Sequence, residues 1–291
     1  MAMYLGLANG DIPNEPAGFT APLIARWAEM GIRSLSVHFV AGPAAVRGDA
    51  PDVRARLADG GIHVAQMAGV NANFVHASPE VRAEAHRRVL AAIPTAVALG
   101  ATMISSGAGT SRDDWQQNFY APHADNYSER AKADLIEGLR GIAPHIEEAG
   151  ISYTIECHQL SAMRSPEAIR EILDAVDSPV ITANFDPVNL LDSAVAVFDN
   201  AARMAHMIDV VGPRYGASCH LKDVAVTDEF VCRILEVQPG EGVLDYDAFF
   251  EQVRRLPDGS ALIVEHLTPE RSAEGVRYVR ERALAAGIEL L

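Results

Sequence analysis

Three acidic residues and one histidine stand near the ends of four strand-like runs in the second half of the chain. They are Glu156 in ISYTIECH, Asp186 in VITANFD, His220 in ASCHLKD and Glu265 in ALIVEHL. Each run is apolar and rich in β-branched residues, and a charged side chain in a buried parallel strand is costly unless it is paired or binds a metal. One such residue alone is more often a structural ion-pair partner. Four of them at the same level of successive strands predict a divalent-metal site.

The ligand types indicate which metal and which chemistry this site would support. Three carboxylates and one imidazole suit Mn²⁺, Mg²⁺ or Co²⁺ better than a thiolate-rich or His-rich zinc site, and we expect one Mn²⁺ ion. Open positions on the metal would bind two adjacent substrate oxygens and stabilise the enediolate that forms when a proton next to a carbonyl leaves. Glu156 and Glu265 belong to runs five and eight, on roughly opposite sides of a barrel mouth. We therefore expect them to act as base and acid in turn.

A second set of polar residues should face the substrate. His158 and Lys222 each lie two residues beyond a proposed ligand. Side chains alternate along a strand, so both should point the same way as that ligand and contact sugar hydroxyls or a carbonyl oxygen. The alternative for Lys222 is a salt bridge to Asp223 or to another acid at the rim. His38, which ends the second run, is a further candidate, and its alternative is a hydrogen-bonded structural role.

Two long segments follow strand-like runs, on the face where such barrels place their chemistry. Segment 107–127 is rich in aromatic residues and includes Trp115. We expect Trp115 and its neighbours to form a lid over substrate, or else to pack against the barrel or another subunit. Segment 224–245 contains the turn PGEG at 239–242. Its glycines should serve backbone conformation, because a single GEG is too weak a pattern to indicate a phosphate-binding loop.

Strand-like runs alternate with helical segments along the whole chain. The runs lie at 4–7, 34–40, 63–70, 101–105, 151–157, 180–185, 217–221 and 261–265. Three helices begin with a hydroxyl residue, proline and glutamate, at 78–80, 165–167 and 268–270, where the hydroxyl caps the helix and the acid complements its dipole. The alternation predicts right-handed βαβ crossovers. We expect an α/β fold, a single (β/α)8 TIM barrel, with residues 1–291 as one domain.

Composition and charge exclude several classes of function. The chain has 24 basic and 39 acidic residues, a formal charge of −15 and no basic run, so we expect no nucleic-acid partner. Its first residues lack a signal-peptide pattern, and no apolar stretch approaches the length of a membrane span. We expect a cytoplasmic protein without a membrane partner. Cys157 and Cys219 alternate with proposed ligands and should face the outer helices rather than a metal.

The motifs TIECH, NFDPVNL, CHLKD, PGEG and IVEHL resemble those of the xylose isomerase-like TIM barrels, the sugar phosphate isomerase/epimerase superfamily. The resemblance covers nearly the whole chain. Its most specific part is the ordered set Glu, Asp, His, Glu on strands five to eight, which binds one Mn²⁺ or Co²⁺ in ketose 3-epimerases. The resemblance implies that Glu156, Asp186, His220 and Glu265 are metal ligands and that the two glutamates also transfer protons. It further implies a small-molecule sugar or sugar derivative as substrate and a homo-oligomer.

The sequence departs from ketose 3-epimerases at two positions. Those enzymes carry a histidine three residues after the strand-six aspartate, where this chain has Asn189, and an arginine six residues after the strand-seven histidine, where it has Val226. We expect Asn189 to contact substrate instead. Endonuclease IV, in the same superfamily, is less similar, because it needs histidines at the ends of strands three and four, where this chain has 70–71 (VN) and 105–106 (SS).

Three hypotheses of function remain. The first is a metal-dependent sugar isomerase or epimerase that removes a proton next to a carbonyl. The second is a lyase or dehydratase that uses the same enediolate to expel a β-leaving group, as other members of the superfamily do; a general acid such as His158 would favour it. The third is a non-catalytic, sugar-binding barrel with structural acids. A change of substrate mass separates the first two, and fold and metal alone do not.

Overall fold

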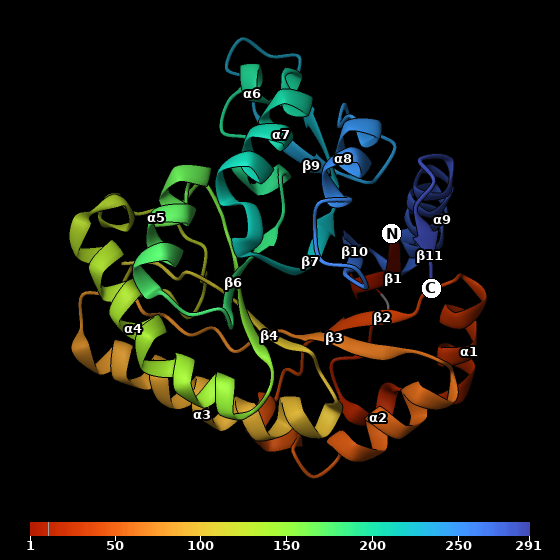
Figure 1. The fold of residues 1–291 in the computed structure, drawn as a ribbon, viewed down its shortest axis with the longest axis horizontal. Helices are drawn as coiled ribbons and strands as arrows, with labels where there is room; N and C mark the ends of the chain where they lie inside the picture. Colours follow the sequence, from red (N-terminus) through yellow and green to blue (C-terminus); the bar gives the residue numbers. More distant parts are fainter. Residues whose placement is uncertain (11) are drawn as a thin grey trace.

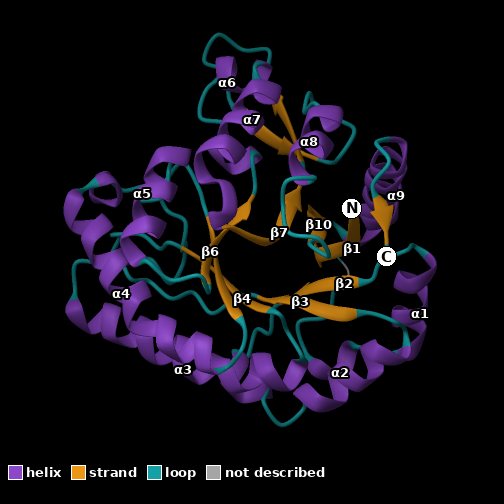
Figure 2. Cartoon of the chain, in the orientation of Figure 1, coloured by secondary structure: helices purple, strands orange, loops and turns teal. Residues whose placement is uncertain are grey.

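The protein is described by a computed structural model that covers residues 1–10 and 12–291. Eight parallel strands form a closed sheet with helices around its outside (Figures 1 and 2). In barrel order they are β1 (Ala2–Asn9), β2 (Ser34–Val37), β3 (His63–Met67), β4 (Met103–Gly107), β5 (Ser152–Glu156), β6 (Ile181–Phe185), β7 (Tyr215–Leu221) and β10 (Ala261–Leu267). The last strand pairs with the first, with Ala261 opposite Tyr4 and Val264 opposite Leu7, and this pairing closes the barrel. The predicted (β/α)8 barrel is confirmed, and each predicted run overlaps one strand.

The helices pack their apolar faces on the outer surface of the sheet. They are α1 (Ala21–Glu29), α2 (Ala50–Asp59), α3 (Pro79–Leu99), α4 (Glu129–Glu148), α5 (Pro166–Val176), α6 (Ala194–Phe198), α7 (Asn200–Val211), α8 (Tyr246–Val253) and α9 (Pro269–Ala285). Short 3₁₀ turns η1 (Pro16–Gly18), η2 (Pro43–Val46), η3 (Ala124–Tyr127), η4 (Val188–Leu190) and η5 (Gly212–Arg214) connect them, and a short strand β11 (Glu289–Leu290) pairs with the start of β1. Each parallel strand is covered on its outer side by helices and on its inner side by the side chains that fill the barrel. Burial on both sides accounts for the apolar runs in the sequence.

The predicted helix caps are confirmed at two of three positions. The hydroxyl of Ser78 accepts a hydrogen bond from the amide of Val81 at 3.3 Å, and that of Ser165 accepts one from Ala168 at 3.3 Å. At the third helix, Thr268 has the extended backbone of a cap, but its side chain makes no capping bond. Helix α9 therefore begins with only two of the predicted signals, the proline in its first turn and Glu270 near the positive end of its dipole.

The segment after β7 contains a hairpin that the sequence pattern did not predict. Strands β8 (Asp223–Val226) and β9 (Ile234–Val237) pair antiparallel beside the barrel mouth. The buried carboxylate of Asp223 fixes this segment, because it accepts hydrogen bonds from the amides of Val224, Gly240 and Leu244 at 2.8–3.0 Å. Gly240 has a φ of +93°, as expected for a glycine that serves the turn.

The two cysteines next to proposed ligands lie in the main apolar core. Cys157 and Cys219 are both fully buried there, and burial raises the pKa of each thiol. This placement agrees with the prediction that they face the helices. Among the described helices, none is long and apolar enough to cross a membrane.

Candidate metal centre

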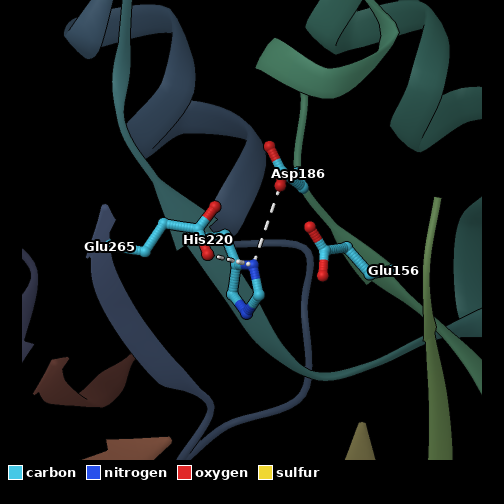
Figure 3. A group of neighbouring side chains, drawn as sticks. All are labelled: Glu156, Asp186, His220 and Glu265. Carbon is cyan, nitrogen blue, oxygen red and sulfur yellow. Dashed lines mark ion pairs between the residues drawn. The ribbon is translucent and has the colours of Figure 1, made fainter. Parts of the chain in front are cut away.

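Four neighbouring strands bring the predicted ligands together at one end of the barrel. Glu156 ends β5, Asp186 directly follows β6, and His220 and Glu265 lie near the ends of β7 and β10. Figure 3 shows the three carboxylates converging on the imidazole ring. One potential ligand atom from each residue lies within 4.8 Å of all the others. Carboxyl ends of parallel strands meet at one face, so this cluster follows directly from the strand order.

A chain of hydrogen bonds across the barrel interior fixes the ring of His220. The Asn184 side-chain oxygen accepts from the Ser218 hydroxyl at 2.6 Å, and that hydroxyl accepts from the Gln66 amide at 2.9 Å. The amide oxygen of Gln66 is thereby left to face Nε2 of His220, at 3.1 Å. Nε2 carries a proton in this arrangement, and Nδ1 faces the carboxylates, 2.9 Å from Glu265. Gln66 is a functional residue that the sequence did not single out.

Two neutral donors hold the carboxylate of Glu156. The hydroxyl of Tyr120 donates to one oxygen at 2.9 Å, and the amide of Asn189 donates to the other at 3.1 Å. The same amide also donates to Asp186 at 2.7 Å. Asn189, expected as a substrate contact, therefore orients two candidate ligands as well as lining the cavity. Tyr120 reaches this position because it lies across Gly107, where an added Cβ would stand 2.5 Å from its ring.

Lys222 does not occupy the position expected for a substrate contact. Its side chain is 1% exposed, and its ammonium lies 2.9 Å from Asp186, is hydrogen-bonded to Glu265 and lies 3.8 Å from Glu236. It is absent from the described residues that line the cavity. The alternative salt bridge is the observed role, although its partners are the candidate ligands and not Asp223. The alternation of side chains predicted the direction of Lys222 correctly but not its burial, which depends on the hairpin that covers it.

Charges within the cluster shift the pKa values of its members in opposite directions. Burial, followed by the nearby charge of Glu265, raises the pKa of Glu156 above its ordinary value. Burial would also raise the pKa of Glu265, but the cations of His220 and Lys222 outweigh it and hold that pKa well below its usual range. Burial lowers the pKa of His220 less than the charges of Glu265 and Asp186 raise it, and the net value is about 10. The carboxylates therefore favour positive charge at this point.

A second acid–imidazole pair borders the site and was not expected from the sequence. His266, directly after the candidate ligand Glu265, has a φ of +57°, which is unusual for a residue other than glycine. Its Nδ1 lies 2.7 Å from a carboxylate oxygen of Glu236, on the hairpin strand β9. This pairing outweighs burial and raises the pKa of His266. No sequence signal placed Glu236 here, because the hairpin itself was not predicted.

The cluster opens into a cavity of about 410 Å³. His38, His158 and Asn189, which the sequence suggested as substrate contacts, are among the residues that line it. Nδ1 of His158 accepts a hydrogen bond from the amide of Leu160 at 3.1 Å, which leaves Nε2 toward the cavity, and burial lowers the pKa of this ring. Trp115 is not among the described residues that line the cavity: it is 6% exposed and stacks under the guanidinium of Arg88, 5.3 Å from its ring centre. From segment 107–127, Tyr120 contributes to the wall instead.

The donor set fits a divalent cation. Three carboxylates and one imidazole supply hard oxygen donors and one nitrogen, the combination suited to Mg²⁺, Mn²⁺ or Co²⁺. Nδ1 of His220 is buried and lies 2.9 Å from Glu265 and 3.7 Å from Asp186, so loss of its proton would leave a lone pair beside these carboxylates. The other nitrogen is bound to Gln66, as expected for a histidine that ligates a metal. These residues form a possible divalent-metal site.

Comparison with known proteins gives the family. A family model described as "Xylose isomerase-like TIM barrel" matches residues 24–282. The chain belongs to this family. The resemblance noted from the motifs TIECH and IVEHL is thereby confirmed. No curated protein sequence matches the chain.

Several solved structures share this xylose isomerase-like fold. A xylose isomerase-like TIM barrel protein from Mycobacterium smegmatis in complex with magnesium has a TM-score of 0.71 and 15% identity, over 98% of this chain and 97% of the other. A D-psicose 3-epimerase in the presence of D-fructose has a TM-score of 0.68 and 16% identity, over 98% of each chain. The 3-keto-D-glucoside 4-epimerase YcjR from E. coli has a TM-score of 0.69 and 15% identity, over 96% and 99%. At these identities the likeness shows the fold alone.

Proposed function

We propose that this xylose isomerase-like barrel is a divalent-metal-dependent sugar isomerase or epimerase, with Mn²⁺ as the preferred ion. The observation that carries the proposal is the convergence of four ligand atoms, within 4.8 Å, at the floor of a cavity of about 410 Å³. Sugar epimerases among the structures of similar fold support the substrate class. The strongly acidic chain and the absence of any apolar membrane-spanning helix in the described residues agree with a small-molecule substrate.

The opposite pKa shifts of the two glutamates support an acid and base pair in this proposal. The pKa of Glu265, held well below its usual range by His220 and Lys222, keeps this carboxylate ionised; to act as the base it must be freed from part of this positive charge, which weakens its basicity. Glu156 has the raised pKa of a group that can carry a proton, and Tyr120 and Asn189 fix its orientation. A metal bound to the cluster would stabilise the negative charge of an enediolate. Opposite shifts in two carboxylates are typical of an acid and base pair.

Elemental analysis of the chelator-treated and Mn²⁺-reloaded protein tests the metal site. We expect about one equivalent of metal in the wild type and a loss of stoichiometric binding in Asp186→Asn and His220→Ala. Asp59→Asn, at an exposed position on α2, is the matched control and should bind like wild type. A wild type that takes up no added metal would refute the proposal.

Replacement of Glu265 by Gln tests catalysis separately from the fold. We expect turnover of a panel of ketoses, inososes and 3-keto-glycosides to fall by at least about a hundredfold, because a general base contributes roughly that much. Circular dichroism should show an intact fold. Full retention of a sugar-binding function without any turnover in the wild type would support the non-catalytic barrel instead.

A lyase or dehydratase is the second candidate, favoured by one specific observation. His158 lines the same cavity, and its Nδ1 accepts from the amide of Leu160, so the neutral ring carries its proton on Nε2 and can donate it to a leaving oxygen. The mass of the product decides between the candidates. An isomerase leaves the substrate mass unchanged, a dehydratase removes one water, and cleavage of a glycoside gives two products.

A further inference from the structure

An acid–imidazole pair borders the proposed catalytic cavity without belonging to the candidate metal cluster. Glu236, on the hairpin strand β9, and His266, near the end of β10, both line this cavity. Their side chains are 35% and 44% exposed, whereas that of Glu265 is 4% exposed. The pair is therefore accessible to a ligand in the cavity, and it lies outside the set of four candidate metal ligands.

An irregularity in β10 aims His266 at the cavity. Residues 7–9 of β1 lie opposite residues 264–267 of β10, so two steps along β1 match three steps along β10. In a regular strand, His266 would point to the other face of the sheet from Glu265. Here the extra residue and the φ of +57° at His266 bring both side chains to the same cavity. Such bulges are rare between parallel strands, and beside active sites they re-aim a side chain.

A purely structural role does not account for this arrangement. A positive φ is uncommon outside glycine and raises the conformational energy of the backbone. A partly exposed ion pair adds little to stability. The hairpin also has other attachments, because the buried carboxylate of Asp223 binds three amides and Glu241, in the turn after β9, pairs with Arg271 of helix α9. These contacts hold the segment at points other than His266.

The carboxylate of Glu236 has one oxygen available for a ligand. Since an ionised carboxylate only accepts, Nδ1 of His266 is the donor to Oε1, at 2.7 Å. Oε2 lies 3.8 Å from Nζ of Lys222, beyond hydrogen-bond range, and accepts no hydrogen bond from the described residues. Hydroxyl groups are the donors that a sugar offers to such an oxygen. A phosphate or carboxylate would instead be repelled by Glu236 and by the charge of −15 on the chain.

We propose that Glu236 is a substrate-binding residue, which accepts a hydrogen bond from a hydroxyl of an uncharged sugar, and that His266 is a positioning residue, which fixes the Glu236 carboxylate. This proposal rests on the proposed function, because it assigns the sugar to the cavity above the metal cluster. The contact comes from the hairpin and not from the barrel strands that supply the candidate ligands. Strand β9 therefore selects among sugars by hydroxyls that do not bind the metal.

Sugar affinities at saturating Mn²⁺ test this contact without any need for turnover. D-Fructose, D-psicose, D-tagatose and 3-keto-D-glucose are titrated into the wild type by calorimetry, and the tightest binder serves as the probe. Glu236→Ala should weaken its binding at least about tenfold, because a hydrogen bond to a charged group is lost. His266→Gly keeps the positive φ without the ring and should weaken binding at least about threefold. Glu241→Ala removes the ion pair with Arg271 outside the described lining of the cavity; it is the control and should bind like wild type.

Each outcome bears on this contact separately from the metal chemistry. Wild-type affinity in Glu236→Ala, an equal loss in Glu241→Ala, or no binding of any of these sugars would overturn the contact, and so would tighter binding of D-fructose 6-phosphate than of D-fructose. Wild-type affinity in His266→Gly alone would overturn the positioning role. Metal-dependent turnover of a ketose would in all these cases leave the proposed function standing. A wild type that binds sugar through Glu236 but turns over no member of the turnover panel would instead refute the proposed function.

Discussion

Lys222 and a metal ion should stabilise the same carboxylates, and this predicts a variant whose stability depends on metal more than that of the wild type. The ammonium lies 2.9 Å from Asp186, is bonded to Glu265 and lies 3.8 Å from Glu236. In Lys222→Met the side chain keeps its approximate length and loses its charge. In a metal-free protein the carboxylates would then repel one another with His220 as their remaining positive partner in the cluster.

The size of the effect follows from the geometry. At an effective dielectric constant of about 20, the attraction between Lys222 and Asp186 at 2.9 Å is about 6 kcal/mol, and that between Lys222 and Glu236 at 3.8 Å is about 4 kcal/mol. Desolvation of the buried charges offsets much of this gain, and removal of one partner from a buried pair costs about 3–5 kcal/mol in measured cases. We therefore expect Lys222→Met to lower the free energy of unfolding by about 3–5 kcal/mol in chelator. Added Mn²⁺ should remove most of the difference, because the ion supplies positive charge to Asp186 and Glu265.

Urea unfolding followed by circular dichroism, in chelator and in excess Mn²⁺, measures both quantities. Lys132→Met is the matched control, because Lys132 pairs only with the exposed carboxylates of Glu129 and Glu171 among its described salt bridges. A surface pair contributes about 1 kcal/mol or less, and its loss should not respond to metal. A Lys222→Met protein as stable as wild type in chelator, or one that Mn²⁺ stabilises no more than wild type, would refute the reasoning.

Four further predictions concern the groups around the cluster. Gln66→Leu removes the hydrogen bond to Nε2 of His220 and should weaken Mn²⁺ binding, measured by calorimetry, about 10–100-fold. The control Gln252→Leu, on α8, should bind Mn²⁺ like wild type. Equal affinities in both variants would contradict the role of Gln66. The pKa of His220, raised from 6.5 to about 10, means that a proton competes with metal at neutral pH, so affinity should rise about tenfold per pH unit from 6.5 to 8.5, with proton release in calorimetry. In chelator the stability of the protein should change with pH in the opposite direction. The pKa of His220 is higher in the folded than in the unfolded protein, so its contribution to stability is fully present below pH 6.5 and is lost as pH rises toward 10. A urea midpoint that does not change with pH would argue against this. Tyr120→Phe removes one donor from Glu156 and should lower turnover about tenfold with metal content unchanged; wild-type turnover would exclude a role for this hydroxyl.

The barrel and the cluster of candidate metal ligands could be predicted from the sequence, because both depend on local sequence pattern. Apolar β-branched runs, separated by helices with proline and hydroxyl start signals, specify parallel strands covered by helices. Strand order then places the end of each run at one face, so the convergence of Glu156, Asp186, His220 and Glu265 followed from position along the chain alone. His158 and Asn189 were likewise placed by their spacing from these residues, and both line the cavity.

What the sequence could not supply depends on contacts between segments far apart in the chain. Gln66 is 154 residues from His220, and no local pattern indicates that its amide orients that ring. Tyr120 rather than Trp115 faces the cluster because Gly107 leaves room for the phenol, whereas the indole packs under Arg88. Periodicity along one strand gives the direction of a side chain but not what covers it. Lys222 points as its spacing predicts, yet only the tertiary structure decides that its charge is buried beside the candidate ligands Asp186 and Glu265, with Glu236 of the hairpin 3.8 Å away.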